Sequence, residues 1–495
     1  MLINPYFDGD FSKLKALFPA SSLTVGLGVT ALPRAALGYF LPNYQIVSLL
    51  ETSDLAGLRK LFPVISLEKT LNTCPPEKFS TSSLLSCPQV VKYLAGLSQK
   101  TGKKINLAVY KASTQIDDIV KKQGLNLLST PGIIRRDFEH KKYFRTDGQK
   151  AGLNLIPGES MKVADLTEKK YQKLMLSYGS RLVFQLTGYS IGGGRGTFFI
   201  NEKKDFVKFK DFVNTTGQRI VKYTGVNVTK FIDGVPASVV ACATRYGTLV
   251  SILQTQIMDQ PELSPFSFRN GNWNGHDWFI NFPLSRQLKA EAQAKKWGDF
   301  IFKKGYRGIF GLDVVVEAQT GKIWPVECNS RYTGAFPVYT MMQLNQGEVP
   351  LDLFHFLEWF GIDYQIDLDQ VQKLYRQPKK GSHFILANLE KKFVIVAGQV
   401  KGGVYNFSQE KDKIKIQWQR PGFSLLDLKN DHELVLADRA PLRYSVLKPA
   451  ERIGRLIFKR PVIDHKGRLL PKIKEIINNI YNLFELTPIQ KPKGF

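Results

Sequence analysis

Two carboxylates in the chain would meet if the segment around Gly321 folds as a β-hairpin. The residues on either side of Gly321 are rich in Val, Ile and Trp, as strands usually are, and glycine suits the last place of a three-residue loop. Pairing Ala318 with Lys322 across that loop puts Asp313 directly opposite Glu327. Opposed side chains lie about 5 Å apart, so the two acids would repel each other. A divalent cation held by both is the simplest reason for such a pair.

The same face of the predicted hairpin carries further polar groups. Asn329 lies two residues beyond Glu327 and points the same way, whereas Cys328 between them points to the other face. Gly311, opposite Asn329, leaves room for a ligand, and Arg331 continues the polar row. Carboxylates, an amide and a guanidinium are the groups needed to hold Mg²⁺ on a polyphosphate and to neutralise a transferring phosphoryl group. The alternative is a solvated hairpin face whose acids pair with Arg331.

The segments GLDVVVE and WPVECNSRYTG of this hairpin resemble the metal-binding end of the ATP-grasp superfamily. In that family an acid on one strand and E-x-N-x-R on the next hold the magnesium ions of MgATP. The resemblance implies Asp313, Glu327 and Asn329 as ligands of Mg²⁺, or of Mn²⁺ in its place, and Asn329 and Arg331 as catalytic residues. It also implies carboxylate activation, in which ATP phosphorylates a carboxylate and an amine or other nucleophile displaces the phosphate.

Two upstream segments resemble the same family in the order that it implies. Residues 138–158 have the pattern of a basic helix with an extended exit, and Lys141 or Lys142 fits the place of the family's phosphate-binding lysine. Residues 188–196 join two strand-like segments and resemble the family's glycine-rich lid, whose free backbone N–H groups can wrap an anion. The cofactor-binding residues expected in this lid are Gly192, Gly193, Gly194, Arg195 and Gly196.

The chain departs from the ATP-grasp pattern at one position and resembles it in one further segment. The strand before the lid often carries a lysine in the family, whereas this chain has Gln185 near that place, which can hydrogen-bond the phosphates but brings no charge. Residues 227–234 resemble the hinge between the two lobes, where Lys230 and Ile232 would contact adenine through their backbone. Plain sheet structure is the alternative for the hinge, because only backbone atoms are expected to act there.

The whole chain predicts a multidomain protein of α/β and α+β class. Strand-like segments between residues 22 and 110 alternate with helical stretches, which is typical of a small parallel α/β domain, and Gly26-x-Gly28 alone is too short a motif for a dinucleotide site. The predicted parts are residues 1–135, an α/β domain like that preceding ATP-grasp lobes; 136–228, an N-lobe with the lid; 229–365, a C-lobe with the metal hairpin; and 380–495, a basic β-rich unit with a terminal amphipathic helix.

Two stretches outside these motifs also carry expectations. Residues 258–283 are aromatic and irregular, and we expect them to shape the substrate pocket. Apolar residues from Ile473 to Phe484 recur at helical spacing between basic flanks. We expect this helix to pack on its own domain rather than on a membrane or a partner.

Charge and cysteine usage bound the class of protein. The chain of 495 residues has a formal net charge of +26, and residues 373–495 hold 25 Lys and Arg against 11 Asp and Glu. Such a field attracts anions without choosing among nucleotides, peptides, nucleic acid and lipid headgroups. The four cysteines lack metal-binding spacing, and neither a secretory signal nor a transmembrane run is visible, so we expect a reduced cytoplasmic protein.

Together these features predict an ATP-dependent ligase that activates a carboxylate as an acyl phosphate and joins it to an amine of an amino-acid or peptide-like substrate, releasing ADP and phosphate. The expected partners are therefore small carboxylates and amines, and nucleic acid is not required. One alternative is a degenerate ATP-grasp protein that binds nucleic acid or another anionic partner, which the charge and Gln185 motivate. Another is an ATP-grasp kinase that phosphorylates without ligation. The sequence leaves the oligomeric state open.

Overall fold

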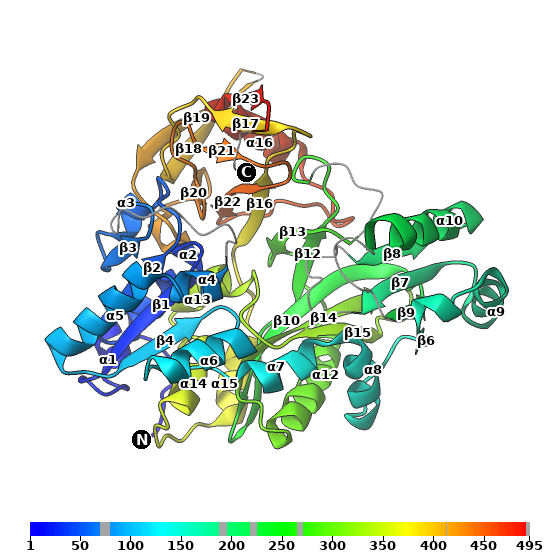
Figure 1. The fold of residues 1–495 in the computed structure, drawn as a ribbon, viewed down its shortest axis with the longest axis horizontal. Coiled ribbons are helices and arrows are strands. Elements are labelled where there is room, and N and C mark those ends of the chain that lie inside the picture. The colour runs from blue at the N-terminus through cyan, green and yellow to red at the C-terminus, as the bar shows by residue number, and fades with distance from the viewer. Residues whose placement is uncertain (70–79, 188–195, 218–224, 265–270, 412, 492–495) are drawn as a thin grey trace.

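The chain folds into a parallel-sheet domain, a smaller four-stranded lobe and one long antiparallel sheet that runs from the middle of the chain to its C-terminal part (Figure 1). This arrangement confirms the predicted mixture of α/β and α+β parts. Among the helices of the described residues, none has both the length and the apolar composition that crossing a membrane requires. The computed structural model describes residues 1–69, 80–187, 196–217, 225–264, 271–411 and 413–491.

The N-terminal domain is a five-stranded sheet in the order β3-β2-β1-β4-β5, and every pair in it is parallel. Its central strand β1 is buried along its whole length, because helices cover both faces and two separate apolar cores lie against them. The strand-like segments predicted between residues 22 and 110 form strands β1 to β4. The strands are β1 (Leu23–Gly28), β2 (Tyr44–Ser48), β3 (Val64–Ser66), β4 (Ile105–Val109) and β5 (Asn126–Leu127), and the helices are α1 (Phe11–Lys15), α2 (Leu32–Ala35), α3 (Leu55–Leu58), α4 (Thr81–Leu85), α5 (Pro88–Thr101) and α6 (Thr114–Lys122).

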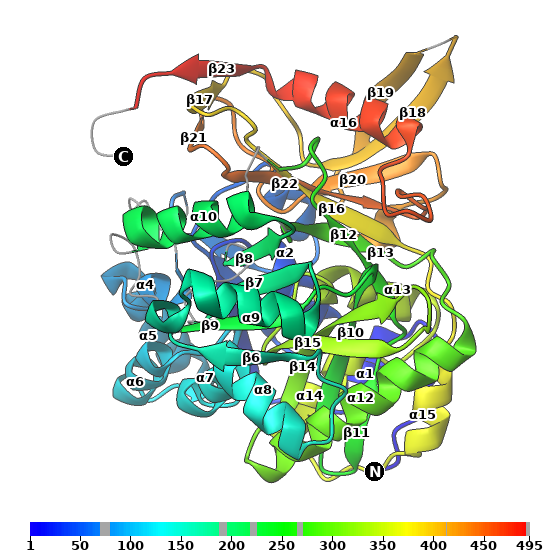
Figure 2. The same ribbon diagram turned by 90° about the vertical axis from the view of Figure 1, so that its right-hand side faces the viewer.

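The next part of the chain forms a four-stranded antiparallel sheet in the order β6-β9-β7-β8. Phe184 and Phe198 on its strands pack with Phe206 and Phe209 of α10, which holds the helix on one face of the sheet (Figure 2). Two helices, α7 and α8, lead into it. The bounds are α7 (Gly132–Glu139), α8 (Lys141–Lys150), β6 (Gly158–Met161), α9 (Glu168–Tyr178), β7 (Leu182–Thr187), β8 (Thr197–Ile200), α10 (Lys203–Phe212) and β9 (Gly225–Lys230).

The long sheet has the order β15-β14-β10-β12-β13-β16-β22-β20-β18-β19, with β11 paired to β10. Its C-terminal strands are continuous with the strands of the middle of the chain, because β13 pairs with β16. Strand β13 lies within residues 258–283, which the sequence predicts to be irregular. Helix α12 packs on β10 and β11. The bounds are β10 (Gly234–Thr244), β11 (Gly247–Val250), β12 (Gln254–Met258), β13 (Trp273–Asp277), α12 (Leu284–Lys303), β14 (Gly308–Glu317), β15 (Ile323–Asn329), α13 (Phe336–Asn345), α14 (Leu351–Trp359) and α15 (Leu368–Tyr375).

The C-terminal strands carry a small three-stranded sheet, β21-β17-β23, and the last helix, α16. The apolar face of α16 is buried in a core that β16, β18, β20 and β22 share, so the helix packs on its own domain as predicted. The bounds are β16 (Ser382–Ala387), β17 (Phe393–Val396), β18 (Gly403–Glu410), β19 (Lys413–Arg420), β20 (Glu433–Ala437), β21 (Val446–Leu447), β22 (Arg452–Phe458), α16 (Pro471–Phe484) and β23 (Leu486–Ile489).

The hairpin β14–β15 has the predicted residue pairs at its polar end, but the pairs near its turn differ from the prediction. Asp313 lies opposite Glu327 and Gly311 opposite Asn329, as expected. Nearer the turn, however, Val314 pairs with Pro325, because the loop is one residue longer than predicted. A bulge at Val326 adds one residue to β15 and restores the expected register.

The bulge turns two consecutive side chains toward the same side of the hairpin. Val326 and Glu327 both line the central cavity together with Asp313. Leu312 and Cys328 lie in the core beneath α12, so Cys328 points away from the acids as predicted. The loop before β15 ends at Gly321, which has the left-handed φ of +63° that the predicted turn requires.

We expect Gly321→Ala to lower the free energy of unfolding by roughly 1 kcal/mol, because a side chain disfavours left-handed backbone. Gly96 is the matched control, since it lies inside helix α5 with open space around it. Gly96→Ala should stabilise the protein by up to about 1 kcal/mol. Urea denaturation of both variants checks the two signs, and an unchanged midpoint for Gly321→Ala would contradict the role given to this turn.

Candidate active site

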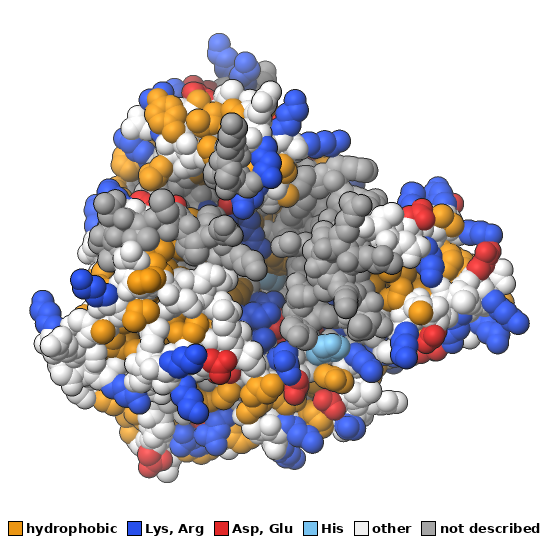
Figure 3. Space-filling model, in the orientation of Figure 1, with side chains coloured by type: hydrophobic (Ala, Val, Ile, Leu, Met, Phe, Trp, Pro, Cys, Tyr) orange, Lys and Arg blue, Asp and Glu red, His pale blue; other side chains and the backbone are white. Residues whose placement is uncertain are grey.

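A cavity of about 1120 Å³ lies where the three parts of the chain meet. Its walls come from residues after β1 and β4, from the four-stranded lobe, from the hairpin β14–β15, from the two residues after β20 and from β22. Figure 3 shows Lys and Arg side chains in the hollow at the middle of this face of the molecule. The cavity contains most of the residues that the sequence singled out.

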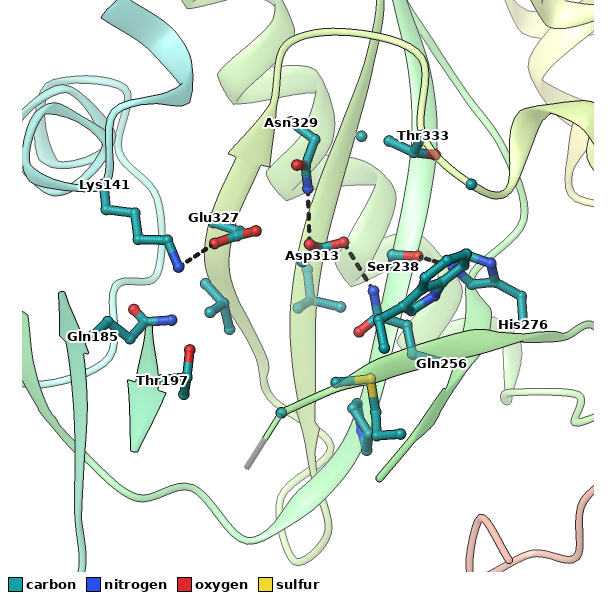
Figure 4. Close-up of a pocket in the computed structure, with 18 of the residues that line it drawn as sticks. Lys141, Gln185, Thr197, Ser238, Gln256, His276, Asp313, Glu327, Asn329 and Thr333 are labelled. Carbon is teal, nitrogen blue, oxygen red and sulfur yellow. Dashed lines mark hydrogen bonds and ion pairs between the residues drawn. The ribbon is translucent and has the colours of Figure 1, made fainter. Parts of the chain in front are cut away.

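The acids of the hairpin face this cavity and are held by a side chain of the hairpin itself and by side chains from two other elements, β12 and α8 (Figure 4). Asp313 accepts hydrogen bonds from the amides of Asn329 (2.9 Å, to Oδ2) and Gln256 (3.0 Å, to Oδ1). Glu327 forms an ion pair with Lys141 at the start of α8, with 2.7 Å between Nζ and Oε2. The structure therefore brings the predicted acids, Asn329 and one of the two predicted lysines into a single site.

The surroundings of Asp313 disfavour its negative charge. Burial and then the neighbouring charge of Glu327 raise the pKa of Asp313 to about 7, although Arg331 and the Asn329 hydrogen bond act in the opposite direction. A cation between the two carboxylates would remove the repulsion and favour the ionised form. Two carboxylates suit Mg²⁺, which usually takes its other ligands from water and substrate phosphates. No cluster of three or more His, Cys, Asp or Glu side chains with metal-binding geometry occurs in the described ranges, so the pair has no third acid.

Arg331 does not pair with either hairpin acid, so the alternative of a solvated face with Arg331 as counter-ion is wrong. Its guanidinium forms an ion pair with Glu139 (Nε to Oε1, 2.8 Å) and donates to Oδ1 of Asn329 (2.7 Å). Burial opposes the charge of Glu139, but Arg331, Lys111 and Arg135 outweigh it and lower the pKa of Glu139 to about 2. Arg331 is thus anchored, and it turns the oxygen of Asn329 away from Asp313.

Of the phosphate-binding residues predicted in this part of the chain, some line the cavity and others do not. Gln185 on β7 lines the cavity, and Figure 4 shows it on the same side as Lys141. Lys142 is exposed and is not among the residues that line the cavity. Gly196 closes the β7–β8 connection, where its carbonyl accepts from Leu186 N–H (2.9 Å). Gly192, Gly193, Gly194 and Arg195 lie outside the described residues.

Comparison with solved structures identifies the architecture. A biotin carboxylase from Campylobacter jejuni, solved as a β,γ-ATP complex, matches with a TM-score of 0.58 and 11% identity over 94% of this chain and 92% of its own. The biotin carboxylase domain of a 2-oxoglutarate carboxylase from Hydrogenobacter thermophilus, solved with MgADP, ADP and bicarbonate, matches with a TM-score of 0.56 and 11% identity over 95% and 91%. An N5-carboxyaminoimidazole synthase from Aspergillus clavatus, solved with ADP and 5-aminoimidazole ribonucleotide, matches with a TM-score of 0.53 and 11% identity over 94% and 100%.

The chain has the ATP-grasp fold. At this identity the likeness establishes the fold, and it covers nearly the whole of the chain. No protein-family model and no curated protein sequence matches the chain. The expected ATP-grasp architecture is therefore confirmed by structure rather than by sequence similarity.

One wall of the cavity, between the four-stranded sheet and the hairpin β14–β15, is apolar. Ile156, Ile232 and Trp324 form a small cluster, with Val315 and Val326 packed against it. Ile232 belongs to the predicted hinge, and Lys230 beside it lines the cavity with an exposed side chain. The apolar wall lies on the same face of β14 as Asp313, because Val315 follows that residue by two positions.

Several cavity residues were not found from the sequence. Gln256 on β12 holds Asp313, and its only local signal is its place in an alternating strand. A group of basic residues from the two ends of the chain also lines the cavity. Neither set belongs to a contiguous motif, so only the pairing of distant segments reveals them.

The raised pKa of Asp313 predicts a pH-dependent stability that a neutral replacement removes. Protonated Asp313 contributes stability that is complete below about pH 4 and is lost as the pH rises through about 7. Asp313→Asn should therefore unfold with a free energy roughly 2 kcal/mol higher than the wild type at pH 8, and with a smaller difference at pH 5. Urea denaturation at both pH values measures this.

Asp137→Asn is the control, because Asp137 is an exposed acid outside the cavity. It should follow the wild type at both pH values. Parallel pH dependences for Asp313→Asn and the wild type would show that the hairpin acids do not destabilise each other in the ligand-free protein.

Proposed function

We propose that the protein is a ligase that uses MgATP to activate a carboxylate and to join it to an amine. The observation that carries this proposal is the pair Asp313 and Glu327, held together in one cavity with Lys141 beside it and an apolar wall nearby. The ATP-grasp fold of the chain supports the proposal, and the ADP and MgADP in solved structures of that fold support nucleotide use here.

The cavity offers separate places for the parts of ATP. We assign the adenine to the apolar wall formed by Ile156, Ile232, Val315 and Val326, next to the hinge backbone at Lys230. The phosphates would then lie toward Lys141 and Gln185, with Lys141 exchanging its ion pair with Glu327 for a phosphate oxygen. Gln185 contributes only hydrogen bonds, so Lys141 is the principal cationic contact that this lobe supplies among the described residues.

Asp313 and Glu327 would hold Mg²⁺, which when bound supplies positive charge to the β- and γ-phosphates. Asn329 joins the ligands only if its amide turns, because its oxygen faces Arg331 and its nitrogen faces Asp313. Arg331, fixed by Glu139, is placed to stabilise negative charge on the transferring phosphoryl group. These residues bind and orient, and no protein nucleophile is required.

The proposed reaction needs only ATP, the carboxylate and the amine as reactants. A carboxylate oxygen of the substrate attacks the γ-phosphorus, the bond to the β-phosphate oxygen breaks, and ADP leaves. The amine nitrogen then attacks the carbonyl carbon of the acyl phosphate, phosphate departs, and the nitrogen loses its proton as the amide forms.

We expect Glu327→Gln and Asp313→Asn to weaken Mg²⁺-dependent binding of the ATP analogue AMP-PNP by tenfold or more, because each removes one of two charges that hold the metal. Isothermal titration calorimetry with and without Mg²⁺ measures this. Glu317→Gln is the control on the same strand, since Glu317 does not line the cavity and should bind as the wild type does. Wild-type protein that binds no nucleotide, or Mg²⁺ dependence that survives in both variants, contradicts the proposal.

A screen of amino acids, small carboxylates and amines for ADP release, followed by mass spectrometry, identifies the reaction class. An amide product with released phosphate supports ligation. A stable phosphorylated product would show a kinase instead. Salt-sensitive binding of nucleic acid without nucleotide binding would favour the degenerate alternative.

A further inference from the structure

A second group of charged residues lines the same cavity, between the parallel N-terminal sheet and the C-terminal strands. Two of its members follow β1 and β4, the neighbouring strands at which the order of the sheet reverses. The carboxyl ends of such strands form a crevice that ligands commonly occupy. The other members lie after β20 and on β22. The basic cluster consists of Arg34, Lys111, Arg439, Arg452 and Arg455.

The acids near the basic cluster neutralise only part of it. Asp438 accepts hydrogen bonds at Oδ2 from the guanidinium of Arg455 (3.1 and 3.2 Å) and at Oδ1 from the hydroxyl of Thr30 (2.8 Å). Arg439 lies 3.6 Å from Glu451. Lys111 pairs with Glu139, which also serves Arg331. Neither Arg34 nor Arg452 has a carboxylate partner within the described chain.

Arg34 is a buried cation whose partners are backbone carbonyls. Its side chain is 5% exposed, and it donates to Leu27 O (3.0 Å) and Thr30 O (3.3 Å). Gly28 makes this position available, because a Cβ there would lie 2.1 Å from the guanidinium carbon. A buried charge without an opposite charge is costly, so the position favours a bound anion. The Gly26-x-Gly28 pair, too short for a dinucleotide motif, thus leaves space for Arg34.

Arg452 opens into the cavity from the first position of β22. Its guanidinium makes no hydrogen bond and no ion pair with any described residue, although Asp438 and Arg455 are close enough to affect its pKa. Its side chain is exposed and lines the cavity, whereas the six residues that follow it on β22 are buried. This guanidinium therefore has free donors directed at space that a ligand can fill.

The backbone beside Arg452 is held in an unfavourable conformation. Asp438 and Arg439 are consecutive non-glycine residues with left-handed φ values of +57° and +84°. Such strain is unfavourable for residues that carry a side chain, and it is concentrated at binding and catalytic sites. Here it places Asp438 against Arg455 and directs Arg439 to the same part of the cavity.

We propose that the basic cluster binds an oxyanion group, a phosphate or a second carboxylate, carried by the carboxylate or amine substrate. This inference rests on the proposed ligase function, and it narrows the substrate to one that carries an anionic group besides the reacting centre. Guanidinium groups bind phosphate and carboxylate through paired hydrogen bonds, and here Arg34 and Arg452 have no carboxylate partner among the described residues. The ATP phosphates are assigned elsewhere, to Lys141 and Gln185 of the four-stranded lobe.

The test is calorimetric titration of the full-length protein, saturated with Mg²⁺ and AMP-PNP, with inorganic phosphate, succinate or acetate at constant ionic strength. We expect phosphate or succinate to bind about tenfold or more tightly than acetate. Arg452→Gln should weaken that binding by about tenfold or more, and it removes no bond within the described protein. Tighter phosphate binding indicates a phosphorylated substrate, and tighter succinate binding a dicarboxylate.

Arg468→Gln is the control, because Arg468 is exposed, pairs with Asp464 and does not line the cavity. Equal anion affinities in Arg452→Gln and the wild type, or equal affinity for acetate and the other two anions, would overturn the proposal. A titration without nucleotide separates the two proposals. If the protein binds anions through Arg452 but does not bind AMP-PNP, only the ligase assignment is contradicted. If it binds the nucleotide but has no anion site that depends on Arg452, only the proposed anion subsite is contradicted.

Discussion

Two like charges held opposite each other are the constraint on which the rest of the site depends. Asp313 and Glu327 come from adjacent strands of one hairpin, and their separation is set by backbone pairing rather than by attraction. Lys141, Asn329 and Gln256 compensate for the repulsion only in part, since the pKa of Asp313 stays raised. Repulsion between the two carboxylates therefore persists in the ligand-free protein, and binding of a divalent cation between them would relieve it.

The cavity around this pair exists because distant segments of the chain are fastened to one another. The long sheet connects the hairpin to the C-terminal strands through the pairing of β13 with β16. Asp438 then joins those strands to the N-terminal domain, because it binds Arg455 on one side and Thr30 on the other, and its N–H donates to Asp54. The acids and the basic cluster therefore occupy fixed walls of one space.

Local patterns in the sequence were sufficient for the parallel N-terminal strands and for the hairpin acids. The facing of Asp313 and Glu327 was predicted correctly although the loop length was wrong, because the longer loop and the bulge at Val326 offset each other. Bulges depend on packing around the strand, here the core beneath α12 and the apolar wall, and the sequence carries no separate signal for them.

The remainder of the site could not be predicted, because it results from contacts between distant segments. Gln256 and Arg452 each lie on a short strand whose local sequence contains no binding motif, and their role follows from what the fold places opposite them. Arg331 was expected near the hairpin acids, but Glu139 on α7 competes for it. Strand β13 was missed because five residues among irregular aromatic neighbours give too little periodicity to detect.

The most direct measurement is a crystal structure of the protein with Mn²⁺ and AMP-PNP, recorded near the manganese absorption edge. The account predicts an anomalous peak within ligand distance of both Asp313 and Glu327, with the nucleotide phosphates beyond it and the adenine against Ile232. A peak elsewhere, or a bound nucleotide whose phosphates lie away from these two acids, would contradict it.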